Sequence, residues 1–136
     1  MPPLADEIRQ TRPFRGPAHE ATLSVLRTAD VVRRHLTRIV GPAGLTIHQY
    51  NVLRILRGAG GAPLSVLDIQ NRLLEETPGV NRIIERLVTR KLVRRDRSHT
   101  DRRLLECFIT EAGLQVLAGL DDDMDRALGE LARGLE

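Results

Sequence analysis

Cysteine, tryptophan and long apolar runs are scarce or absent in this chain of 136 residues. Its one cysteine, Cys107, cannot form a disulfide within the chain, so nothing in the sequence requires an oxidising compartment. No run approaches the roughly 18 apolar residues that a membrane-spanning helix needs, and the first residues lack the basic and apolar segments of a secretory signal. We therefore expect a cytoplasmic protein with no membrane partner.

Aromatic residues and the residue sets of enzymes are also scarce. Phenylalanine, tyrosine and tryptophan make up 2% of the chain, too few to stack the bases of a single-stranded nucleic acid. The four histidines lack metal-ligand spacing, and no nucleophile with a base and an orienting group can be assembled. The glycine-rich segment 58–61 lacks the following Lys and Ser or Thr of a phosphate-binding loop. We expect no enzymatic activity, no metal and no cofactor.

Positive charge, in contrast, is concentrated in one segment. The chain has a net charge of +3, whereas the stretch from Arg82 to Arg103 holds nine Arg or Lys and three acidic residues. Such a basic patch on a nearly neutral body suits a polyanionic partner, and the shortage of aromatics favours duplex DNA. The alternative is a solvated charged surface without a partner.

Apolar spacing predicts a mainly α-helical chain with a small β-hairpin, an α+β fold. Residues 1–18 hold four prolines and are expected to form a flexible tail. Residues 19–40 repeat apolar positions every three or four residues, as one face of a helix does. Capping patterns that start at Thr46 and at Ser65 predict two further helices.

A fourth helix is predicted to begin at Pro78, with Thr77 as its N-cap. Successive residues placed 100° apart put Val80, Ile84 and Leu87 on an apolar back and leave a polar, arginine-bearing front. The pattern therefore predicts a helix with one buried face and one face free for a partner.

A hairpin and a last helix complete the predicted fold. Residues 92–95 and 104–109 are typical of two short strands around a polar tip, and Thr110 opens the last helix. Its apolar positions are three or four residues apart, the spacing of a seam for another helix. They are Leu117, Leu120, Met124, Leu128, Leu131 and Leu135.

Four short segments follow one another in a specific order: GLTIHQYNVL at 44–53, PGVNRIIERL at 78–87, DRR at 101–103 and ITEAG at 109–113. Each is weak alone. In this order and spacing they resemble the MarR (multiple antibiotic resistance regulator) family of transcription regulators, over about residues 19–136. The second segment is similar to the family's recognition helix, and the DRR matches its wing.

The resemblance implies a winged helix-turn-helix at 45–110, flanked by N- and C-terminal dimerisation helices at 19–40 and 112–136. It also implies an obligate homodimer on palindromic double-stranded DNA, with control by a small-molecule effector or an oxidant in many members. We expect a ligand-responsive repressor whose dimer seam is formed by Leu117, Leu120, Met124, Leu128 and Leu131. Lys91 departs from the family's usual glycine, and Gly79 and Asn81 replace its two usual threonines.

The expected DNA contacts lie on the fourth helix and on the wing. Arg82 is suited to donate bidentately to guanine, and Asn81 to contact adenine. The resemblance implies that Asp101 stiffens the wing by an ion pair while an arginine, for which we favour Arg103, enters the minor groove. The expected set is Thr77, Pro78, Gly79, Asn81, Arg82, Arg86, Thr89, Asp101, Arg102 and Arg103.

Each of these interpretations has an alternative. For Arg82 it is an ion pair with Glu75 or Glu85, and for the hairpin tip a solvated turn.

Cys107 alternates with apolar neighbours and is predicted to be buried and structural rather than a redox sensor. The alternative function is a winged-helix module that binds protein. Outward arginines on both the helix and the wing favour DNA.

Overall fold

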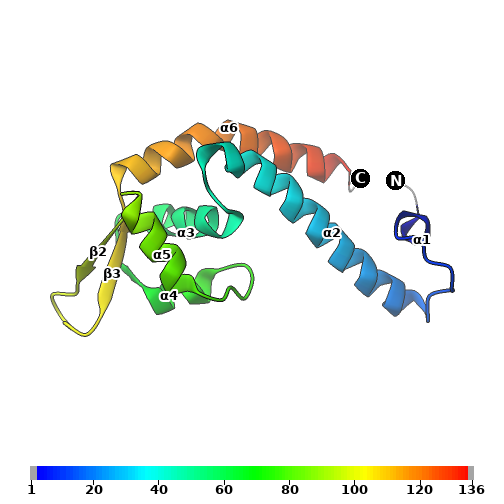
Figure 1. Cartoon of the computed structure of the whole chain (residues 1–136), viewed down its shortest axis with the longest axis horizontal. Helices are drawn as coiled ribbons and strands as arrows, with labels where there is room; N and C mark the ends of the chain where they lie inside the picture. The colour runs from blue at the N-terminus through cyan, green and yellow to red at the C-terminus, as the bar shows by residue number, and fades with distance from the viewer. Residues whose placement is uncertain (1–2, 135–136) are drawn as a thin grey trace. The chain divides into compact units, whose positions relative to one another are not determined.

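The computed structural model describes residues 3–134 (Figure 1). The ends of the expected tail and of the expected last helix, including Leu135, lie outside these residues. The described chain divides after His35 into two compact units.

The N-terminal unit contains a short helix, α1 (Leu4–Glu7), and most of a long helix, α2 (Pro17–Val40). The two helices are joined by an ion pair, in which Arg27 Nε lies 3.4 Å from Glu7 Oε1. Part of the expected tail is therefore helical. Helix α2 begins at Pro17 rather than at residue 19, because the fixed φ of proline suits the first turn of a helix.

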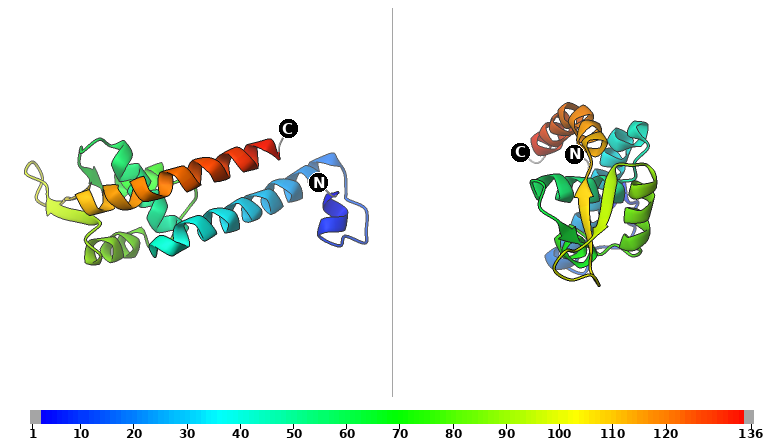
Figure 2. Two further views of the ribbon diagram at one scale, coloured as in Figure 1. Left: turned by 90° about the horizontal axis from the view of Figure 1, so that it is seen from above. Right: turned by 90° about the vertical axis from the view of Figure 1, so that its left-hand side faces the viewer.

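From Leu36 onward the chain forms a winged helix-turn-helix. After the last turn of α2, its elements are η1 (Gly41–Ala43), α3 (Ile47–Gly58), β1 (Leu64–Ser65), α4 (Val66–Arg72), α5 (Val80–Thr89), β2 (Val93–Arg97), β3 (Leu105–Ile109) and α6 (Glu111–Arg133). Strands β2 and β3 extend beyond the helices of this unit as a hairpin (Figure 2). The mainly helical fold with a β-hairpin wing is thus confirmed.

The hairpin belongs to a three-stranded antiparallel sheet in the order β1-β3-β2. Cys107 in the central strand pairs with Leu64 on one side and with Arg95 on the other. Strand β1 was not expected, because its two residues are too few to show an alternating pattern. It attaches the start of α4 to the base of the wing.

The core of this unit lies between its four main helices. Its fully buried side chains include Leu53 and Leu56 of α3, Ile69 of α4, Ile84 and Leu87 of α5, and Leu117 of α6. Burying one such side chain contributes about 1.5 to 3 kcal/mol, so the shared core fixes α5 relative to its neighbours. None of the described helices is long and apolar enough to cross a membrane.

Three hydroxyl caps fix where helices begin, as predicted. Each accepts a hydrogen bond of 3.1 Å from an amide three residues on. The pairs are Thr46 with Gln49, Ser65 with Asp68, and Thr110 with Gly113.

The predicted start of the fourth helix is wrong. Helix α5 begins at Val80, and its N-cap is Gly79 in the left-handed conformation at φ 71°, without a side-chain cap. The Thr77 hydroxyl instead donates to the Glu75 carbonyl at 3.1 Å. Glycine adopts a positive φ without a steric penalty, which lets the chain turn into α5 after Pro78.

The C-terminal end of α5 is a Schellman motif. The Lys91 amide donates to the Val88 carbonyl at 2.9 Å, and the Leu92 amide to the Leu87 carbonyl at 3.0 Å. Lys91 occupies the left-handed position at φ 62°. The family's usual glycine would fit here without strain, so the departure at Lys91 keeps the turn at a cost in conformational energy.

We expect Lys91→Gly to raise the free energy of unfolding by about 1 kcal/mol, because glycine removes the Cβ clash of the left-handed conformation. Urea titration followed by circular dichroism measures the change. Lys91→Ala is the matched control, since it removes the same charge and keeps the Cβ. Equal stability of the two variants would contradict the strain at this position.

Candidate nucleic-acid interface

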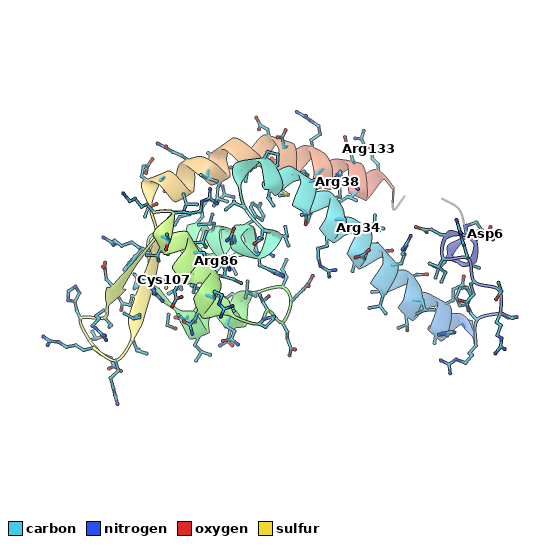
Figure 3. The ribbon with its side chains drawn as sticks, viewed as in Figure 1. Asp6, Arg34, Arg38, Arg86, Cys107 and Arg133 are labelled. Atoms are coloured by element: carbon cyan, nitrogen blue, oxygen red, sulfur yellow. The ribbon has the colours of Figure 1, made fainter. Side chains whose placement is uncertain are left out.

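Helix α5 has the two faces that its sequence predicts. Val80, Ile84 and Leu87 are buried in the core. Opposite them, Arg82 and Arg86 are exposed; Figure 3 labels Arg86 on this helix. The other expected contacts on this segment that are exposed are Pro78, Gly79, Asn81 and Thr89.

The cations of the basic segment fall into two groups. Four guanidinium groups have partners within the chain: Arg90, Arg94, Arg97 and Arg103. Among the described contacts, the other five side chains form no hydrogen bond or ion pair; they are Arg82, Arg86, Lys91, Arg95 and Arg102. The alternative ion pair of Arg82 with Glu75 or Glu85 is therefore not formed within the described chain.

The wing tip is ordered by a buried serine that the sequence analysis did not single out. Ser98 is 3% exposed, and its Oγ accepts from the amides of Thr100 and Asp101, each at 3.2 Å. Arg97 Nη1 closes the tip by donating to the Arg102 carbonyl at 2.8 Å. A serine in a tight polar turn is the signal that could have identified this contact.

Asp101 positions Arg103 at the tip of the wing. One carboxylate oxygen, Oδ1, accepts from the Arg103 amide at 3.1 Å and from its Nε at 3.2 Å. The Arg103 side chain is nevertheless 91% exposed, so its remaining donors point into solvent. The structure thus contains the ion pair that the resemblance implies, and Arg103 is the arginine that Asp101 holds.

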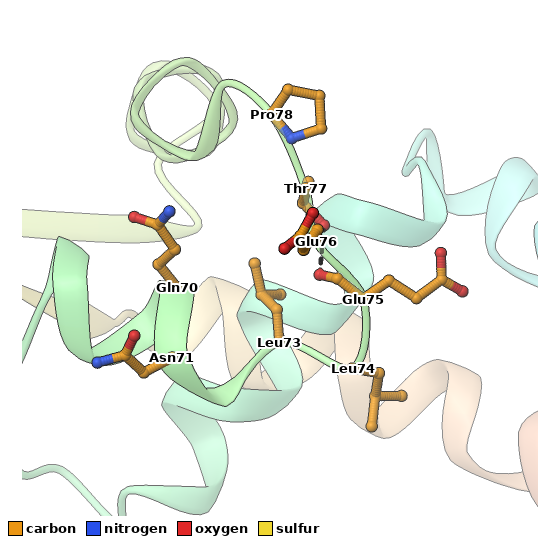
Figure 4. Close-up of a pocket in the computed structure, with 8 residues that line it drawn as sticks. All are labelled: Gln70, Asn71, Leu73, Leu74, Glu75, Glu76, Thr77 and Pro78. Atoms are coloured by element: carbon orange, nitrogen blue, oxygen red, sulfur yellow. Dashed lines mark hydrogen bonds between the residues drawn. The ribbon is translucent and has the colours of Figure 1, made fainter.

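The turn of the helix-turn-helix contains one expected contact that is not accessible. Thr77 is only 9% exposed, so its side chain is not available to a partner. It lines a hollow of about 700 Å³ between α4 and the segment that leads into α5 (Figure 4). The other lining residues are Gln70, Asn71, Leu73, Leu74, Glu75, Glu76 and Pro78.

Cys107 is buried, as predicted, and lies at the centre of the sheet (Figure 3). Burial raises the pKa of its thiol, although the charge of Arg95 partly opposes this shift. A thiol with a raised pKa holds little reactive thiolate near neutral pH. The described environment of Cys107 is that of a structural cysteine.

The expected dimer seam on α6 needs correction. Leu117, Leu120 and Met124 are at most 7% exposed and belong to the core of their own chain. A spacing of three or four residues predicts a buried helix face but does not say whether the same chain covers it. Further along, Leu128 is 50% exposed and Leu131 is half-buried.

An ion pair reinforces the attachment of α6 to α3. Arg57 Nη1 donates to both carboxylate oxygens of Asp121, at 2.9 and 3.0 Å. Nearby on α3, burial raises the pKa of Tyr50, with Arg57 and Arg54 partly opposing the shift. The first half of α6 is therefore a structural part of the winged unit.

A helix-turn-helix whose second helix carries exposed arginines, followed by a hairpin with an arginine at its tip, defines a winged helix-turn-helix DNA-binding protein. Residues 43–104 match the sequence profile of the MarR family. A MarR transcription factor from Planctomyces limnophilus has a similar structure, with a TM-score of 0.73 and 34% sequence identity over 90% of this chain and 91% of that one. The chain belongs to the MarR family of transcription regulators.

Two more distant structures share the fold. BpsR of Bordetella bronchiseptica, whose DNA binding is regulated by 6-hydroxynicotinic acid, is 22% identical over 86% of this chain and 87% of its own, with a TM-score of 0.75. A MepR mutant of S. aureus bound to an oligodeoxyribonucleotide is 18% identical over 85% and 84%, with a TM-score of 0.64. No curated protein matches the chain.

Proposed function

We propose that this protein is a ligand-responsive repressor that binds a palindromic site in double-stranded DNA as a homodimer. The observation that carries the proposal is the pair of unpartnered arginines, Arg82 and Arg86, on the exposed face of α5. An unpaired guanidinium keeps all its donors for bases and phosphates.

In this proposal α5 enters the major groove. Arg82 donates to guanine, Asn81 contacts adenine, and Arg86 contacts a phosphate. Gly79 caps α5 without a side chain, so the first amides of the helix keep their hydrogen-bonding capacity for a phosphate. Pro78 and Thr89 border the same surface, and Thr77 contributes only by shaping the turn.

The wing enters the minor groove with Arg103 at its tip. Asp101 holds the Arg103 Nε, which leaves the terminal nitrogens free to face a narrow, electronegative groove. In this proposal Arg102 contacts the adjacent phosphates. Its side chain has no described partner.

The dimer and the effector are supported by separate observations. Val25 and Leu26 of α2 and Leu128 of α6 are 68%, 63% and 50% exposed in the single chain. Exposed apolar side chains on both long helices favour coverage by a second copy. A small organic effector is proposed by analogy with BpsR.

A gel shift at two salt concentrations distinguishes this function from a winged-helix module that binds protein. We expect retardation of duplex DNA and a loss of affinity of at least about 100-fold between roughly 50 and 200 mM salt, because phosphate contacts release counterions. A protein-binding module would give no salt-dependent retardation.

We expect Arg82→Ala to weaken binding to the cognate duplex by about 1 to 3 kcal/mol per half-site, because it removes a bidentate base contact. Binding to a scrambled duplex should stay nearly unchanged. Competition titrations with both duplexes measure the ratio. An equal loss on both would assign Arg82 to the phosphate backbone instead.

Arg103→Ala should act differently, since the charge in the minor groove contacts no unique base pattern. We expect the largest loss at A·T-rich flanks and a decrease of about one unit per wing in the slope of affinity against salt concentration on logarithmic axes. Affinity measured over a salt series checks this. An unchanged slope would place Arg103 outside the groove.

A further inference from the structure

Arg90, the residue that ends the recognition helix, reaches across the fold to the segment that follows α2. It is the C-cap of α5. Its Nη1 donates to the Gly44 carbonyl at 2.7 Å, and its Nη2 donates to the Ala43 carbonyl at 3.0 Å. A planar guanidinium can make both bonds at once, and charge-assisted hydrogen bonds of this kind are stronger than neutral ones.

The segment 41–44, whose carbonyls accept the Arg90 hydrogen bonds, is compact and follows α2 directly. The Leu45 amide donates to the Val40 carbonyl at 3.3 Å, across the three residues of η1, and the Gly44 amide donates to Gly41. Gly44 has φ 75°, and a Cβ built on it would lie 3.3 Å from Arg90 Nη2. A glycine here therefore permits both the left-handed turn and the close approach of the guanidinium.

The same end of α5 is also attached to the start of α6. The Thr110 hydroxyl donates to the Lys91 carbonyl at 2.7 Å, and its amide donates to the Leu92 carbonyl at 3.1 Å. Thr110 is the N-cap of α6. The C-terminal end of the recognition helix is thus bonded on one side to the segment after α2 and on the other to the beginning of α6.

We propose that Arg90 is a positioning residue that sets how the two recognition helices of a dimer are spaced on DNA. The segment that follows the last turn of α2 and the first residue before α6 are both hydrogen-bonded to the end of α5, so the two bonds of Arg90 hold α5 at a fixed angle to residues 36–40 of α2. This inference rests on the proposed dimeric DNA binding. In this proposal Arg90 itself does not contact DNA.

Half-site spacing is a sensitive measure of this angle. Lengthening the spacer by one base pair moves a half-site by about 3.4 Å and rotates it by about 35°. A dimer with rigidly held recognition helices tolerates neither change, whereas a dimer with loosely held helices adjusts to both. Loss of a structural contact alone would weaken binding to all spacers by the same factor.

The test measures affinity of the full chain for the palindrome it selects, for duplexes with one base pair more or less in the spacer, and for a single half-site. For the wild type we expect a loss of about tenfold or more with either altered spacer. For Arg90→Met, which cannot donate, the loss should shrink to about threefold or less, with an unchanged salt slope and unchanged half-site affinity. Arg90→Lys, which can reach only one carbonyl, should give an intermediate ratio.

Arg86→Ala is the matched control. It removes an exposed arginine one turn earlier on the same helix, and it should weaken binding to all spacers equally and lower the salt slope. A wild-type spacing ratio in both Arg90 variants overturns the proposal. If Arg90→Met does not fold, a wild-type ratio in Arg90→Lys overturns it alone. A wild type that binds palindrome and half-site equally well overturns the proposed dimeric function itself.

Discussion

Gly113→Ala should lower the free energy of unfolding by about 3 kcal/mol, although alanine is normally the better helix former. Gly113 is buried in the first turn of α6. A Cβ built there would overlap the Leu92 carbonyl and the Ile109 side chain. Because Leu92 precedes β2 and Ile109 ends β3, the first turn of α6 would have to move away from the base of the wing.

Gly119→Ala is the control for this substitution. Gly119 lies on the same helix, is exposed, and has no atom within 4 Å of a built Cβ. Its replacement should stabilise the protein by about 0.5 to 1 kcal/mol. Urea titrations of both variants at one protein concentration give the comparison. A Gly113→Ala protein as stable as Gly119→Ala would show that α6 does not pack against Leu92.

We expect the double variant Leu26→Asp and Leu128→Asp to raise the dimer dissociation constant at least about 1,000-fold. Because both subunits carry the two substitutions, four leucines would be lost from the interface and replaced by carboxylates. Each buried leucine contributes about 1.5 kcal/mol or more. Leu120 is unsuitable for this test because it is buried in its own chain, so its replacement would unfold the domain.

Leu67→Asp with Leu74→Asp is the matched control, since these leucines are 64% and 77% exposed on the helix-turn-helix. Light scattering and sedimentation give the mass of each protein. The control should remain a dimer, whereas the double variant should sediment as a monomer with unchanged circular dichroism. A Leu26 and Leu128 variant that stays dimeric would place the interface elsewhere.

Local hydrogen-bonding patterns were predictable from the sequence. Thr46 and Ser65 sit three residues before a partner that returns the hydrogen bond, so each cap depends only on neighbours in the chain. The buried face of α5 was equally clear, because Val80, Ile84 and Leu87 recur with the period of a helix.

Features set by backbone conformation or by distant parts of the chain could not be predicted in this way. Thr77 and Pro78 form a good local start signal, but the positive φ of Gly79 and the bond from Thr77 to Glu75 move the start of α5 to Val80. The Arg90 fork joins residues 46 and 47 positions apart, a separation that no short motif reports.

The site residues likewise divide into those whose contacts are local in the sequence and those whose surroundings depend on distant parts of the chain. Asp101 and Arg103 are two residues apart, and their ion pair was expected from the DRR motif. The apolar spacing on α6 identified a buried face but assigned Leu117 to a partner subunit rather than to the chain's own core. Burial depends on which helix lies opposite, and periodicity carries no information about that.

Selection of duplexes from a random pool by the purified full chain, followed by sequencing of the retained fragments, tests the central claim most directly. We predict a palindrome whose half-site centres lie about one helical turn apart, or a multiple of it, as two symmetry-related recognition helices require. Fragments with no shared sequence, or with one unrepeated half-site, would contradict sequence-specific binding by a homodimer.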